Sequence, residues 1–77
     1  MDTFMAEYAK HLERAVKEYP EEYRWPLAVL PQQLGEMRAA IGRRAFVKDT
    51  RAMRATCRAL GIKCTYRAIA NFIANHV

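Results

Sequence analysis

The strongest constraint on this sequence is a pair of amphipathic segments that meet at Gly61, in the last third of the chain. Asp49 or Thr50 can cap the first segment, because a short side-chain oxygen accepts hydrogen bonds from the free amide groups of a helix start. Gly61 suits the left-handed position that often ends a helix, and Thr65 can cap the second segment. Two short helices are not stable alone. The rest of the chain must therefore supply a third layer.

Each of these segments has an apolar and a polar face, which predicts one helix from the Asp49 cap to Gly61 and another from about Tyr66 toward His76. The apolar stripes are Met53, Cys57 and Leu60 in the first, and Tyr66, Ile69, Phe72, Ile73 and Val77 in the second. The polar stripes are Arg51, Arg54 and Arg58 in the first, and Arg67, Asn71 and Asn75 in the second.

The first half of the chain predicts two more helices. Residues 3–18 have one apolar face and one charged face, on which Glu13 and Lys17 are spaced to form an ion pair. The second helix should run from Pro31 to about Arg44, since proline suits a first helical turn. Its apolar positions are Leu30, Leu34, Met37, Ile41 and Ala45. Its two glycines, Gly35 and Gly42, allow another helix to approach closely or simply weaken this one.

No segment shows the alternating pattern of a strand. The sequence therefore predicts a single all-α domain over residues 1–77, a compact bundle of about four short helices. The last two helices are expected to form a helical hairpin or a degenerate helix-turn-helix.

Charge is distributed unevenly along the chain. Its 13 Lys and Arg residues exceed its 8 Asp and Glu residues, which gives a net charge of +5. Nine of these basic residues lie in residues 38–77, where Asp49 is the single acid. This asymmetry predicts an anionic partner, either nucleic acid or an acidic protein surface. A solvated surface of uneven charge, or a homodimer that pairs acidic with basic halves, would also account for it.

The candidate partner-binding residues follow from this basic surface. They are Arg51, Arg54, Arg58, Lys63, Arg67 and Asn71, with Tyr23 and Trp25 as a second choice. Tyrosine, tryptophan and arginine are the favoured anchors of protein interfaces. A structural role is the favoured interpretation of the two aromatic residues, which would cover the open end of a small bundle.

The chain contains no serine, no glycine-rich phosphate loop and no HExxH motif. We therefore expect a protein that is not an enzyme and needs no cofactor or metal. Cys57 and Cys64 lack the second close-spaced pair of a zinc ribbon, and reduced thiols are expected. The alternative is a disulfide, or a zinc site that includes His11 or His76. No apolar run reaches the roughly 18 residues of a membrane span, so a cytoplasmic protein without membrane insertion is predicted.

The segment RALGIKCTYRAI is similar to the helix-turn-helix pattern in a small residue four before the glycine, in Leu60-Gly61-Ile62, and in Thr65 at the second helix start. It has one residue fewer between Gly61 and Thr65, which places Arg67 where the pattern has a buried aliphatic residue. The resemblance implies DNA binding. The base-reading residues would be Lys63, Arg67, Asn71 and Asn75, and the phosphate contacts Lys48, Arg51, Arg54 and Arg58.

The stretches YAKHLERAVKEYPEEYRWP and RATCRALGIKCTYRAIANFIA resemble small accessory proteins of proteobacterial phages and prophages. This resemblance implies stoichiometric docking on a host protein, which is thereby inhibited or redirected. Our leading prediction is such a binding protein, and the alternative is a small DNA-binding regulator. A third interpretation is a subunit that pairs only with itself, with its basic face against its acidic half.

Overall fold

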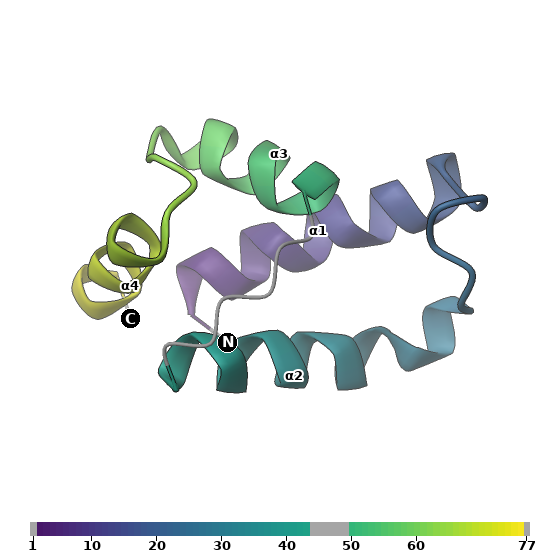
Figure 1. The fold of residues 1–77 in the computed structure, drawn as a ribbon, viewed down its shortest axis with the longest axis horizontal. Helices are drawn as coiled ribbons and strands as arrows, with labels where there is room; N and C mark the ends of the chain where they lie inside the picture. Colours follow the sequence, from purple (N-terminus) through teal and green to yellow (C-terminus); the bar gives the residue numbers. More distant parts are fainter. Residues whose placement is uncertain (1, 44–49, 77) are drawn as a thin grey trace.

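The part of the chain that the structure describes forms four α-helices and one short 3₁₀ helix (Figure 1). The computed structural model describes residues 2–43 and 50–76, and these ranges contain no strand. The elements are α1 (Thr3–Glu18), η1 (Leu27–Val29), α2 (Leu30–Gly42), α3 (Thr50–Leu60) and α4 (Tyr66–Asn75). The prediction of an all-α bundle of four short helices is confirmed.

The helix boundaries agree closely with the sequence pattern. Helix α2 begins one residue before Pro31 and ends at Gly42, which is earlier than predicted. The predicted end at Arg44, the apolar position Ala45 and the Asp49 cap lie outside the described residues. The predicted 3–18 helix has the bounds of α1.

Helix α1 lies at the centre of the bundle and contacts α2, α3 and α4, with α3 as its most extensive neighbour. The sequence interpretation placed this organising role in the last third of the chain instead. The reason for the difference is the breadth of the apolar face of α1, which allows contacts on more than one side. Its buried residues are Phe4, Met5, Tyr8, Leu12, Ala15 and Val16.

The start of α1 is tied to α2 through one carboxylate. Asp2 caps α1, because its Oδ1 accepts a hydrogen bond of 2.8 Å from the Met5 amide. Its Oδ2 lies 3.1 Å from Nε of Arg38 on α2. This carboxylate therefore serves as both a helix cap and an ion-pair partner.

The turn between α3 and α4 has the predicted geometry. Gly61 has φ of +70°, its amide donates to the Arg58 carbonyl at 3.2 Å, and the Ile62 amide donates to the Cys57 carbonyl at 3.0 Å. These two bonds define a Schellman helix end. Thr65 then caps α4, with its hydroxyl 3.2 Å from the Ala68 amide.

Helix α4 lies across the end of the bundle, near the start of α1 (Figure 1). It buries Ile69 and Ile73 in the common core. The Thr3 hydroxyl donates a hydrogen bond of 3.0 Å to the His76 carbonyl. The first and last helices are thus joined directly.

The glycines of α2 do not mark a close approach between described helices. A Cβ atom added at Gly35 or Gly42 would find no described atom within 4 Å. Gly35 instead borders a groove of about 420 Å³ between α1 and α2, whose lining includes Met5, Leu30 and Leu34.

Candidate binding face and adjoining groove

Helix α3 has two chemically opposite faces. The side chains of Ala52, Met53 and Cys57 are buried in the core that α3 shares with α1. The hydroxyl of Thr56 is also buried, and it donates to the Ala52 carbonyl at 2.7 Å. The three arginines predicted for the outer face are exposed: Arg51, Arg54 and Arg58. Their spacing of three and four residues sets them on one side of the helix.

The exposed basic residues of the C-terminal part are mostly without a counter-charge. No acidic residue occurs in residues 50–77. Arg54, Arg58, Lys63 and Arg67 form no ion pair with any residue in the ranges 2–43 and 50–76. Like charges three or four residues apart on a helix destabilise it slightly, by about 0.2–0.5 kcal/mol per pair. These arginines therefore contribute charge to the surface rather than stability to α3.

Arg51 differs from the other two arginines, because a carboxylate of its own chain holds it. Its Nε lies 3.0 Å and its Nη2 2.8 Å from the two carboxylate oxygens of Glu22. Its guanidinium also lies 3.6 Å from the ring centre of Tyr19. The hydrogen bonds from Arg51 hold the pKa of Glu22 below its ordinary value. Arg51 is thus positioned by the connection that follows α1.

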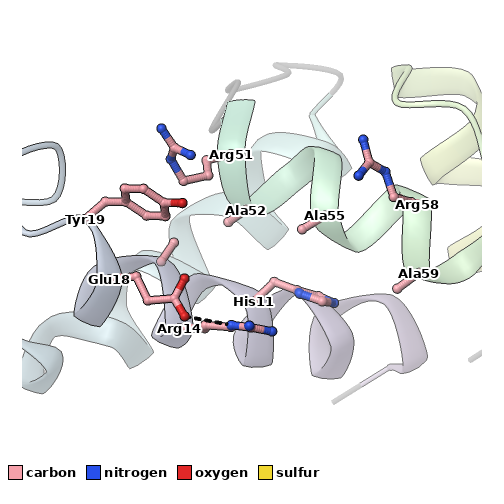
Figure 2. A pocket seen from close by; sticks show the side chains of 10 residues that line it. His11, Arg14, Glu18, Tyr19, Arg51, Ala52, Ala55, Arg58 and Ala59 are labelled. Atoms are coloured by element: carbon pink, nitrogen blue, oxygen red, sulfur yellow. Dashed lines mark hydrogen bonds and ion pairs between the residues drawn. The ribbon is translucent and has the colours of Figure 1, made fainter.

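A groove runs between α1 and α3 (Figure 2). It has a volume of about 380 Å³ and is lined by His11, Arg14, Ala15, Glu18 and Tyr19 of α1 and its C-terminal end, and by Arg51, Ala52, Ala55, Arg58 and Ala59 of α3. The alanine side chains are short, so they form an apolar floor between the longer side chains of α1 and those of α3. The groove therefore combines a small apolar floor with a charged rim.

The rim of this groove contains arginines from both helices. Arg14 donates from Nε to Glu18 at 3.0 Å, and the hydrogen bond with this carboxylate raises the pKa of Arg14. The Nε2 atom of His11 lies 3.2 Å from Oε1 of Glu7. Arg58 stands on the α3 side without an ion-pair partner among the described residues. The rim thus contains both paired and unpaired cations.

The remaining basic candidates lie apart from the groove. Lys63 is exposed in the turn before α4, and Arg67 and Asn71 are exposed on α4. None of these three residues lines the α1–α3 groove. The structure therefore divides the predicted basic surface into two parts, the arginine row of α3 and the polar stripe of α4.

The second-choice anchors are part of the packed structure. Tyr23 and Trp25 form an edge-to-face pair with ring centres 6.2 Å apart, and both are half-buried against the core. This arrangement agrees with the favoured structural interpretation, in which they cover the bundle. The neighbouring aromatic residue Tyr19 is exposed and contributes to the groove instead.

The described residues contain no group of three His, Cys, Asp or Glu side chains that could hold a metal ion. Both cysteines are free thiols, with Cys57 buried and Cys64 exposed. His76 stacks on Phe72 with ring centres 4.0 Å apart. Within ranges 2–43 and 50–76, no helix is both long and apolar enough to cross a membrane.

Comparison of the chain with models of protein families, with curated proteins and with solved structures gives no match.

Two features of this site were not predicted from the sequence: the alanines of the groove and the carboxylate of Glu22. One available signal was the alternation of small and basic residues in α3, where Ala52, Ala55 and Ala59 follow Arg51, Arg54 and Arg58 directly. This spacing sets a row of small side chains beside a row of arginines. No comparable signal marked Glu22, because its partner lies 29 residues away.

Proposed function

We propose that this chain is a non-enzymatic binding protein that docks stoichiometrically on an acidic surface of a partner protein. The observation that carries the proposal is the exposed row of Arg54 and Arg58, which have no counter-charge among the described residues. A positive patch accelerates association with an acidic partner and selects against basic ones. In line with the resemblance to phage and prophage accessory proteins, the proposed partner is a host protein in the cytoplasm, which docking inhibits or redirects.

The test compares two variants with the same change of net charge. One carries Arg54→Glu and Arg58→Glu, and the matched control carries Lys10→Glu and Lys17→Glu on α1. Each tagged protein is used for affinity capture from a nuclease-treated host lysate, and the captured partner is then titrated. The proposal expects the α3 variant to lose affinity by at least about tenfold, because reversed charges face the partner. Equal affinities for the two variants would contradict it.

A second candidate is DNA binding through α4. It is supported by the exposed side chains of Arg67 and Asn71, four residues apart on a helix that Thr65 caps. Arginine and asparagine suit guanine and adenine edges. Under this candidate, affinity for a DNA duplex falls steeply with salt. Changing both Arg67 and Asn71 to alanine then removes sequence preference, whereas the α3 reversal weakens binding to all sequences alike.

A further inference from the structure

The groove between α1 and α3 has the dimensions of a helix-packing site. Its lining spans residues 11–19 along α1 and 51–59 along α3, which is about 12 Å or a little over two turns of each helix. Helices pack by setting the side-chain ridges of one into the groove of another. A third helix laid along the groove would therefore pack between the side chains of α1 and α3.

The floor of the groove is suited to apolar side chains. Ala15 and Ala52 are buried, Ala55 is half-buried and Ala59 is exposed. The accessible apolar surface of the floor therefore comes from Ala55 and Ala59, beside the buried Ala15 and Ala52. Its burial under an incoming aliphatic or aromatic side chain would be favourable, because apolar surface would leave water.

The rim indicates the charge of the occupant. Arg14 and Arg51 already bind carboxylates, those of Glu18 and Glu22, so two guanidinium groups at this site donate hydrogen bonds to carboxylate oxygens. Arg58 on the rim, and Arg54 beside it on α3, are exposed and lack such a partner among residues of the described ranges. An occupant that supplies carboxylates next to an apolar side chain would complement both parts.

The same rim disfavours a nucleic-acid backbone. Glu18 lies in the groove lining and Glu22 is half exposed next to it, so a continuous row of phosphates would meet two negative charges. The phosphates would also leave the alanine floor without an apolar contact. An amphipathic segment can place its carboxylates at selected positions and avoid both problems.

We propose that the α1–α3 groove receives one amphipathic, acidic helix of a partner protein. An apolar side chain of this helix rests on the alanine floor, and its carboxylates bind Arg54 and Arg58. The inference rests on the proposed function, and it specifies the partner segment and the site where this segment binds.

The probe is a labelled synthetic helical peptide of about 18 residues, or five turns, with leucines along one face and glutamates flanking them. A second peptide has the same composition with leucines and glutamates spread around the helix, and a short DNA duplex represents the other class of ligand. Fluorescence anisotropy with the wild-type protein should give at least tenfold tighter binding of the amphipathic peptide than of either comparison ligand. Equal or tighter binding of the scrambled peptide or the DNA would overturn the inference.

Groove-filling variants locate the binding site. Ala55→Leu fills the middle of the floor, Ala59→Leu fills its exposed end, and Ala74→Leu is the matched control on the exposed surface of α4. Circular dichroism checks that each variant is folded. Both groove variants should weaken peptide binding by at least tenfold, and the control should leave it unchanged.

The outcomes separate the two proposals. If the peptide binds Ala55→Leu and Ala59→Leu as tightly as wild type, the groove is not its seat. The proposed function then still stands if Arg54→Glu with Arg58→Glu weakens binding to the captured partner. If that double variant also keeps full affinity for the partner, the docking role of the arginine row is refuted as well.

Discussion

Helices α1 and α3 pack against each other and are both amphipathic, yet they differ in the sign and pairing of their exposed charges. Helix α1 carries six charged side chains with a net charge of zero, whereas α3 carries three arginines and no acid. The α1 charges form ion pairs within the helix at 3.0–3.3 Å: Glu7 with Lys10, Glu13 with Lys17, and Glu18 with Arg14. Only α3 therefore presents a surface of one sign.

This difference is informative because exposed ion pairs add little stability, typically about 0–1 kcal/mol. The pairing on α1 is thus better understood as neutralising a solvated face than as holding the fold together. The row on α3 is not neutralised in this way, because only Arg51 has a carboxylate partner among the described residues. The position of unpaired charge, rather than its total amount, identifies the candidate binding face.

The largest expected effect concerns the buried side of α3. Burial against the core, together with the neighbouring Cys64 thiol, raises the pKa of the Cys57 thiol to about 12, so little of the reactive thiolate is present at pH 8. A disulfide reagent such as Ellman's reagent should modify one thiol of the folded protein rapidly, the exposed Cys64. Cys64→Ser should then react much more slowly until denaturant is added, because the remaining thiol of Cys57 is buried. Rapid reaction of folded Cys64→Ser would show that this side of α3 is open to solvent.

The two faces of α3 should also differ in their contribution to stability. Met53 is 1% exposed, and Met53→Ala should lower the free energy of unfolding by about 2–5 kcal/mol through lost burial and a new cavity. The neighbouring change Arg54→Ala should alter it by less than about 0.5 kcal/mol. Urea unfolding followed by circular dichroism measures both values. Similar losses for the two variants would mean that the arginine row has a structural role after all.

A smaller loss of stability is expected when the charged residue that caps α1, Asp2, is replaced. Asp2→Ala removes the cap of α1 and the partner of Arg38, and should cost about 0.5–2 kcal/mol in unfolding free energy. Asp2→Asn keeps a capping oxygen and should recover most of that loss. The same urea titrations compare the two variants. Equal destabilisation by both would assign the effect to the Arg38 pair instead of the cap.

The smallest effect concerns Glu22, the carboxylate that connects the two regions. Because the hydrogen bonds from Arg51 lower its folded pKa below 4.5, the ion pair stabilises the fold above that ordinary value. This contribution is lost as the pH falls through the lowered folded pKa. An NMR titration of the Glu22 carboxyl carbon should give a midpoint below 4.5 in the wild type and a higher one in Arg51→Ala. An unchanged midpoint would show that the pair does not persist in solution.

The sequence predicted the parts of the fold that depend on local interactions. The stripes of Met53 and Cys57, the left-handed Gly61 and the Thr65 cap follow from helical periodicity and backbone preferences, and the structure confirms them. The docking role of the arginine row stays a prediction.

Contacts between residues far apart in the sequence could not be predicted in the same way. The pairing of Arg51 with Glu22 depends on how the connection after α1 folds back on α3, and no local pattern encodes that distance. The central place of α1 likewise depends on its contacts with α2, α3 and α4 together, which no local pattern encodes. The groove between α1 and α3 exists only once these helices have packed.

The direct link between α1 and α4 has a consequence for how the chain folds as it is synthesised. Thr3 reaches the carbonyl of His76, 73 residues later, and the main neighbour of α1 is α3, which begins at Thr50. The apolar face of α1 thus emerges from the ribosome well before the helices that cover it. Because long-range contacts form only after the intervening chain is closed into a loop, we expect folding to wait for the C-terminal helices. During synthesis, the apolar face of α1 would therefore be exposed to chaperones that bind apolar helices.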